Sequence, residues 1–144
     1  MTDLSDIEPG DQVSVLNGRM NAVFDGEVVS AQDGIILVDV PAKFTRYAFD
    51  WASGVALDGH SRIVKLDDWR AVLIRTQKRH GQFHEELIQA ATEFRKEPSE
   101  ETADAVADVL TAWRAFALAA DPLALTTRSV QEYLQEGGTD GSRD

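Results

Sequence analysis

The sequence predicts an α+β protein in which a small β-barrel precedes a long antiparallel helical hairpin and a short third helix. Residues 9–66 read as short alternating stretches separated by turn residues, a pattern typical of strands. Residues 69–120 instead carry apolar positions in a heptad rhythm, which keeps one stripe of a helix facing a partner. Pro98 divides this region, so we expect two helices rather than one.

Turn residues divide the amino-terminal segment into four or five strands. Asn17-Gly18 is one turn signal, and Asp33-Gly34 supplies the positive φ angles of a tight hairpin. The expected strands are residues 12–16, 26–31, 35–40, 43–51 and 61–66. Closure into a barrel is favoured because it removes the exposed edges of such short strands.

The motifs of this segment resemble a known family of small barrels. Its opening, Pro9-Gly10-Asp11 followed by Gly18 and Gly26, resembles the start of SH3-like barrels, including the KOW type. Residues 46–50 and 62–64 are similar to the later strands of small barrel proteins of bacteria and their phages. The resemblance covers about residues 7–66 and implies an SH3-like barrel.

For the KOW type, the resemblance also implies RNA binding through basic residues. Between Gly18 and Val29 the sequence carries only Arg19 as a basic side chain. The net charge of −11 further opposes binding to phosphate backbones. Nucleic-acid binding is therefore an alternative rather than the leading hypothesis.

The first helix is expected to run from about Asp68 to Lys96. Gly81 lies inside it and costs about 1 kcal/mol relative to alanine. The heptad passes through Gly81 without a change of phase, so one continuous helix is predicted, with a break there as the alternative. The stripe consists of Trp69, Leu73, Thr76, His80, Phe83, Leu87, Ala90 and Phe94.

The second helix is expected to begin after Ser99, which can cap it, and to end near Ala120. A connection as short as Pro98-Ser99 forces the two helices to be antiparallel neighbours. The apolar stripe of the second helix consists of Ala103, Val106, Leu110, Trp113, Ala117 and Ala120. A shorter helix should follow over about residues 127–136. The expected domains are a small β-barrel (1–66), a helical hairpin plus short helix (67–136) and a flexible tail (137–144).

Composition narrows the chemistry that the chain can perform. It has 144 residues and no cysteine, which excludes disulfides, thiolate metal sites and a cysteine nucleophile. Met1–Pro9 lacks the basic and apolar blocks of a signal peptide, and no apolar run approaches the roughly 20 residues that span a bilayer. We therefore expect a cytoplasmic protein without membrane association. No catalytic motif rises above background in the sequence, so neither a cofactor nor enzymatic activity is expected.

Two histidines and three aromatic residues are the candidate sites with specific chemistry. His80 and His84 are four apart, which places both imidazoles on one helix face as a zinc site requires. His80 also occupies the seam, so a packing histidine is the favoured interpretation and no metal site is predicted. Tyr47, Phe49 and Trp51 alternate along one strand and are expected to form the barrel core.

The leading hypothesis is a non-enzymatic protein-binding or assembly module, related to phages or mobile elements, that acts through the hairpin. Two helices cannot bury all the apolar surface that this region offers, so a partner protein or a second copy should complete a helical bundle. The residues expected to bind protein are Trp69, Leu73, His80, Phe83, Leu87, Trp113 and Phe116.

Two alternatives remain open. The barrel could bind nucleic acid, with Tyr47 and Trp51 as a stacking platform beside Arg46. The second alternative is an acidic inhibitor that mimics nucleic acid, because acidic residues recur along the second helix. These residues are Glu100, Glu101, Asp104 and Asp108. The simpler interpretation is that these acidic residues form an ordinary solvated face of the helix.

Overall fold

A computed structural model describes residues 4–126 and 128–137 of the chain. These residues form two compact units. The first unit contains residues 4–74 and 128–137, and the second contains residues 75–126. Helix α1 (Trp69–Lys96) begins in the first unit and continues in the second. Residues 138–144, most of the segment expected to be a flexible tail, lie outside the described residues.

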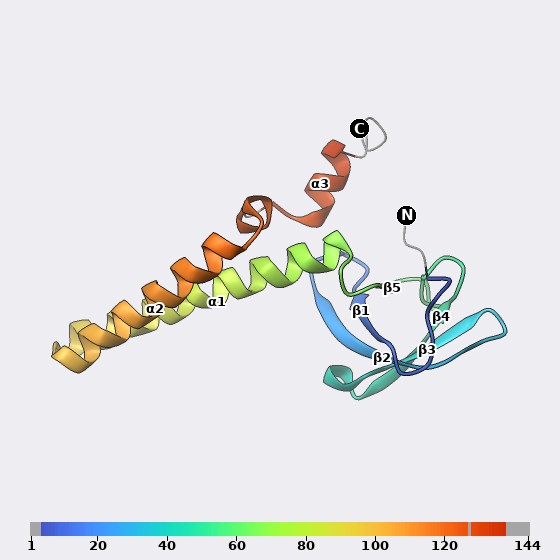
Figure 1. The fold of residues 1–144 in the computed structure, drawn as a ribbon, viewed down its shortest axis with the longest axis horizontal. Coiled ribbons are helices and arrows are strands. Elements are labelled where there is room, and N and C mark those ends of the chain that lie inside the picture. The colour runs from blue at the N-terminus through green and yellow to red at the C-terminus, as the bar shows by residue number, and fades with distance from the viewer. Residues whose placement is uncertain (1–3, 127, 138–144) are drawn as a thin grey trace. The chain divides into compact units, whose positions relative to one another are not determined.

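The first unit is built on a curled five-stranded antiparallel sheet with the order β4-β3-β2-β1-β5 (Figure 1). The strands are β1 (Gln12–Leu16), β2 (Val23–Gln32), β3 (Ile35–Val40), β4 (Thr45–Asp50) and β5 (Arg62–Val64). All five expected strands are present, and the predicted α+β class is confirmed.

The turn between β2 and β3 has the geometry that its residues predict. Asp33 and Gly34 have φ angles of 55° and 78°, and Gln32 pairs with Ile35 across the two-residue loop. Farther along β2 the register shifts between Val28 and Ser30. Such a bulge bends a strand and increases its twist. It helps the long strand β2 to pair with β1 through one half and with β3 through the other.

A short segment, residues 54–57, bridges the two edge strands of this sheet. The backbone N–H of Leu57 donates to the carbonyl of Ala48 in β4 at 3.0 Å. On the other side, the N–H of Ile63 in β5 donates to the carbonyl of Gly54 at 2.8 Å. The outer edges of β4 and β5 are therefore partly paired, which limits their availability for further strands.

The sheet encloses an apolar core to which every strand contributes. Phe49 is fully buried, and Tyr47 and Trp51 pack against the same cluster. The indole N–H of Trp51 donates to the carbonyl of Leu4 at 2.8 Å, which ties the amino-terminal segment to the core. The cluster comprises Leu4, Ile7, Val13, Val15, Val28, Ile36, Val38, Val40, Phe49, Ala56 and Ile63.

The opposite face of β1 is also buried. Because side chains alternate along a strand, Leu16 lies on the face away from Val13 and Val15, yet it is fully buried. The first turns of α1 and helix α3 (Val130–Gly137) belong to the same unit and supply buried apolar side chains. These side chains are Ala71, Leu73, Ile74 and Val130.

Charged and polar groups fix the start of both helices in this unit. The Asp68 carboxylate accepts from the backbone N–H of Arg70 at 3.0 Å and binds the Arg70 guanidinium through both oxygens at 2.9 Å. At the start of α3, Ser129 and Glu132 exchange backbone-to-side-chain hydrogen bonds in a capping box. Each pair satisfies N–H groups that a helix leaves without an internal partner.

The second unit is a hairpin of two antiparallel helices, the remainder of α1 and α2 (Glu100–Ala119) (Figure 1). Helix α1 passes through Gly81 without a break, as the heptad phase predicts. Ser99 caps α2 and forms a capping box with Thr102. The stripe of α2 differs in part from the predicted one, because Leu110 is half exposed whereas Val109 and Phe116 face inward.

Candidate functional site

An aromatic cluster joins α1 and α2 in the middle of the hairpin. The Phe83 ring is 5% exposed and stacks on Trp113 with ring centroids 6.4 Å apart and planes 9° apart. The centroids of Phe83 and Phe116 are 5.4 Å apart. Phe83 is the best-buried large side chain of the described hairpin.

A hydrogen bond between side chains locks the register of this cluster. The indole N–H of Trp113 donates to Nδ1 of His80 at 2.8 Å, and the two rings meet edge to face at 5.3 Å. His80 is therefore the packing histidine that the sequence favours. The ring of His84 lies 6.0 Å from that of Trp113 and is exposed.

Arg79 closes one side of the cluster. Its guanidinium carbon lies 3.8 Å from the centroid of the Phe83 ring, a cation–π geometry. The same guanidinium donates to the carboxylate of Glu86 at 3.1 Å. One arginine thus covers the aromatic ring and neutralises an acid further along α1.

Beyond the seam, the hairpin exposes large apolar side chains. Ile88 on α1 and Leu110 on α2 are each 48% exposed, and Leu118 is 70% exposed. Along α2, Ala103, Ala107, Leu110, Arg114 and Leu118 follow one another at spacings of three or four residues, which places them on one side of the helix. We call Ile88, Leu110 and Leu118 the exposed apolar row.

The sequence-predicted binding residues fall into two groups. His80, Phe83, Leu87, Trp113 and Phe116 belong to the hairpin and lie along its seam, where they are buried or half-buried. Trp69 and Leu73 belong to the first unit, where Trp69 is half exposed and Leu73 is buried. Ile88 and Leu118 are not among the residues expected to bind protein, because they fall outside the heptad stripe.

The aromatic residues of β4 are arranged differently from a stacking platform. Tyr47 and Trp51 pack against the core of the curled sheet, as the favoured interpretation predicts, whereas Arg46 is exposed. Arg46 sits opposite Asp39 on β3. The two rings and the guanidinium therefore present no shared face of the kind on which bases stack.

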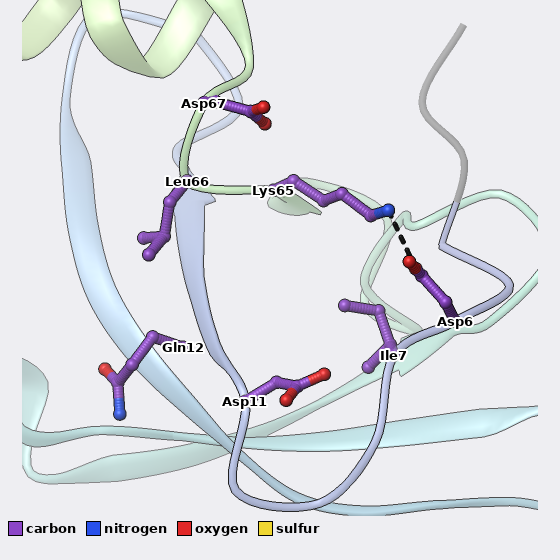
Figure 2. A pocket seen from close by; sticks show the side chains of 7 residues that line it. All are labelled: Asp6, Ile7, Asp11, Gln12, Lys65, Leu66 and Asp67. Atoms are coloured by element: carbon purple, nitrogen blue, oxygen red, sulfur yellow. Dashed lines mark ion pairs between the residues drawn. The ribbon is translucent and has the colours of Figure 1, made fainter.

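A shallow depression lies on the first unit between the amino-terminal segment and the residues that follow β5 (Figure 2). Its volume is about 330 Å³, and Asp6, Ile7, Asp11, Gln12, Lys65, Leu66 and Asp67 line it. Lys65 reaches across to Asp6 with an N–O distance of 2.7 Å, and Asp11 accepts from the backbone N–H of Glu8 at 2.9 Å. Internal contacts thus already engage two of its three carboxylates.

The acidic residues of α2 line a second depression. Glu100, Glu101, Asp104 and Asp108 surround a surface hollow of about 470 Å³ together with Ala105. The amino end of a helix favours carboxylates at Glu100 and Glu101 because of its dipole. Part of this acidic row is therefore explained by helix stability alone.

Phe44 is the most exposed aromatic side chain that the structure describes. It is 97% exposed and follows the 3₁₀ helix Pro41–Lys43 at the turn into β4. Its φ angle of 52° lies in the left-handed region, and its N–H donates to the carbonyl of Pro41 at 3.0 Å. No sequence pattern distinguishes Phe44, because its exposure follows from the turn geometry.

Within residues 4–126 and 128–137, no three histidine, aspartate or glutamate side chains are placed to hold a metal ion. None of the helices in the same residues combines the length and apolar character that crossing a membrane requires. The sequence matches no protein-family model, and comparison with curated proteins and with solved structures finds no significant similarity.

Proposed function

We propose that the chain is a non-enzymatic protein-binding or assembly module that acts through its helical hairpin, residues 75–126. The observation that carries the proposal is that α2 has no buried residue, although most of its 20 residues are apolar. A surface helix normally buries its apolar stripe against the rest of the fold. A partner that packs on the hairpin would provide this burial.

The exposed apolar row supplies the contact surface in this proposal. In this proposal Ile88, Leu110 and Leu118 contact the partner together, because a patch of large exposed apolar side chains marks an interaction site more often than scattered single residues do. Ile88 and Leu110 lie near the middle of the hairpin, and Leu118 extends the row along α2. The partner is a protein, either another chain or a second copy, and no cofactor is involved.

The seam residues support this surface from inside. The stacked Phe83 and Trp113 rings and the His80–Trp113 hydrogen bond hold α1 and α2 in one register. A fixed register presents the exposed row in one geometry, which lowers the entropic cost of binding. Leu87 and Phe116 extend the same seam, whereas Trp69 offers a further half-exposed ring on the first unit.

Affinity capture with matched variants tests the proposal. A tagged chain is compared with Ile88→Glu/Leu110→Glu, which places charges in the exposed row, and with Leu57→Glu, which changes an exposed leucine of the first unit. We expect the unmodified chain and Leu57→Glu to retain the same protein, either a second copy or another chain. The hairpin variant should lose it. Retention by both variants, or no specific capture at all, would contradict the proposal.

The proposal extends to the first unit and to the setting of the protein. We assign the curled sheet to the SH3-like barrels, because β5 returns to pair with β1 and residues 54–57 bridge the edge strands. A cytoplasmic setting and a phage or mobile-element origin rest on the composition and on the resemblance of residues 7–66.

The alternatives have weaker support. A nucleic-acid-binding barrel would have to rely on exposed Arg46, since Tyr47 and Trp51 pack in the core. The acidic hollow on α2 supports a mimic of nucleic acid, which would compete for a basic partner. A mobility shift that weakens with salt would favour the former, and capture of a basic protein lost on Asp104→Lys/Asp108→Lys would favour the latter.

A further inference from the structure

Ile88 and Leu110 lie on the same face of the hairpin. Ile88 directly follows Leu87, which is half-buried in the seam, and one residue turns a helix by about 100° in a fixed sense. Leu110 directly follows Val109, which is half-buried on α2. Because α1 and α2 are antiparallel, the same sense of rotation from the seam leads to the same face. The two exposed side chains can therefore be covered by one partner.

The charges on this face are positive. Arg95 lies seven residues after Ile88, which places it on the same side of α1. Arg114 lies four residues after Leu110, on the same side of α2. Both arginines are exposed, and within the described residues neither forms an ion pair with a carboxylate. We call the face formed by Ile88, Ala91, Arg95, Ala107, Leu110 and Arg114 the basic apolar face.

The acids of the hairpin lie on other sides of the two helices. Glu86 precedes Leu87, and Asp108 precedes Val109, so both acids lie about 100° from the seam in the opposite sense. The opposite face formed in this way includes Glu86, Gln89, Glu93, Glu101, Asp108 and Ala112. Carboxylates, amides and alanine thus occupy one face, whereas large apolar side chains and arginines occupy the other.

We infer that the basic apolar face docks an amphipathic helix of another protein, one whose apolar stripe is bordered by carboxylates. The inference rests on the proposed function and names the chemistry of its partner. The apolar stripe covers Ile88 and Leu110, which are each 48% exposed. The carboxylates pair with Arg95 and Arg114, because a guanidinium binds a carboxylate through two parallel hydrogen bonds.

The positions of the two arginines set the spacing of the partner's acids. The Trp113 ring lies 6.0 Å from that of His84, so Arg114 lies level with this part of α1. Arg95 is eleven residues beyond His84, a distance of about 16 Å at 1.5 Å per residue. A partner helix therefore reaches both arginines with two carboxylates about eleven residues apart, and apolar residues lie between them.

A second copy of the chain fits this face less well. Two copies joined through the same face would bring arginines together and supply no carboxylate from that face, which is unfavourable. A copy that docked through its opposite face would present acids, but it would set glutamine and alanine against Ile88 and Leu110. The charges and the apolar groups together therefore favour a different protein.

Two synthetic helical peptides test the inference on the unmodified full-length chain. Both carry the same leucine stripe; one has glutamates eleven residues apart beside the stripe, and the other has lysines at those positions. By fluorescence anisotropy we expect the glutamate peptide to bind more tightly by about tenfold or more, although the chain has a net charge of −11. Equal affinities, tighter binding of the lysine peptide or binding of neither would overturn the inference.

Charge reversal locates the contact. Arg95→Glu/Arg114→Glu should reverse the preference, so that the lysine peptide binds more tightly. The control Arg19→Glu/Arg46→Glu makes the same change in net charge at exposed arginines of the first unit and should keep the preference for glutamate. Circular dichroism of each variant establishes that the helices are formed. A preference that reverses in both variants, or in neither, would count against the basic apolar face.

The outcomes also separate this inference from the proposed function. The chain might lose a captured protein on Ile88→Glu/Leu110→Glu yet retain it on Arg95→Glu/Arg114→Glu. That result would overturn the acidic partner and leave the binding role of the hairpin intact. A chain that captures no protein and binds neither peptide would contradict both.

Discussion

The hydrogen bond between Trp113 and His80 should contribute measurably to the stability of the hairpin. The indole N–H lies 2.8 Å from Nδ1 of His80 in a half-buried position between α1 and α2. Replacement His80→Leu keeps a side chain of similar size but leaves this N–H without its acceptor. An unsatisfied buried donor costs about 1–3 kcal/mol, and this one is half-buried, so we expect His80→Leu to lower the free energy of unfolding by about 1 kcal/mol.

A double-mutant cycle isolates the pairwise contribution. Trp113→Phe removes the donor and retains an aromatic ring, and the double variant removes both partners. The double variant should be less destabilised than the sum of the single variants by about 1 kcal/mol, which is the usual net value of such a bond. Urea unfolding followed by far-ultraviolet circular dichroism reports this, because α1 and α2 are the longest helices described.

A coupling energy below about 0.4 kcal/mol would refute this reasoning, since residues without a shared contact behave additively within that limit. The variant His84→Leu serves as the control. His84 is exposed and contacts Trp113 through ring proximity alone in the described structure, with centroids 6.0 Å apart. Its replacement should change the free energy of unfolding by about 0.5 kcal/mol or less.

Three further predictions concern the backbone and a helix cap. Gly81→Ala should raise the free energy of unfolding by about 1 kcal/mol, because alanine favours a helix over glycine and the added Cβ meets no atom within 4 Å. A loss of stability in thermal unfolding would contradict a continuous α1. Phe44→Gly should stabilise the first unit by about 1 kcal/mol, because it removes the steric cost of a Cβ at a φ angle of 52°. Phe44→Ala keeps the Cβ and should not stabilise the unit. Equal effects of the two variants in urea unfolding would refute this prediction. Hydrogen bonds from the Ser129 backbone N–H, the larger cause, and from the Ser129 hydroxyl hold the pKa of the Glu132 carboxyl below its usual 4.5. The cap is therefore fully stabilising above pH 4.5, and its contribution is lost as the pH falls through the lowered pKa. Glu132→Gln should remove that acid dependence of α3 in an NMR pH titration, and an unchanged profile would count against the capping box.

Local signals in the sequence predicted much of the fold. Asp33-Gly34 specifies its hairpin because both residues tolerate positive φ angles, and Pro98-Ser99 specifies the turn between helices because one residue ends a helix and the other caps one. These features depend on neighbours in sequence. They can therefore be predicted without knowing the rest of the fold.

The inward stripe of α2 was predicted less well. Val109-Leu110 and Phe116-Ala117 are adjacent pairs of apolar residues, so two neighbouring stripes fit the sequence equally well. The bulk of Phe83 on α1 selects the stripe that contains Phe116, which leaves Leu110 half exposed. Which of the two stripes faces inward depends on the side chains of the partner helix, and the periodicity of α2 alone carries no information about them.

The candidate binding surface differs from the predicted one for the same reason. The heptad identifies side chains that face a partner, and the first partner is the other helix of the hairpin. Residues such as Phe83 and Trp113 already contact each other across α1 and α2 and are not available to a second partner. The side chains left for a second contact, Ile88 and Leu118, become apparent only when the hairpin is assembled.

Photo-cross-linking tests the central claim, the binding of a protein by the hairpin, most directly, because the chain contains no cysteine of its own and a single introduced thiol can carry the cross-linker. Thr111→Cys places a single exposed thiol near the middle of the hairpin, and Thr92→Cys places one nearer the interhelix turn. With a photo-cross-linker attached to the introduced thiol, we expect the full-length Thr111→Cys chain to be joined to a protein partner, either another chain or a second copy, and Thr92→Cys to be joined to it far less. Faster cross-linking at Thr92→Cys, or none at either position, would contradict docking through the centre of the hairpin.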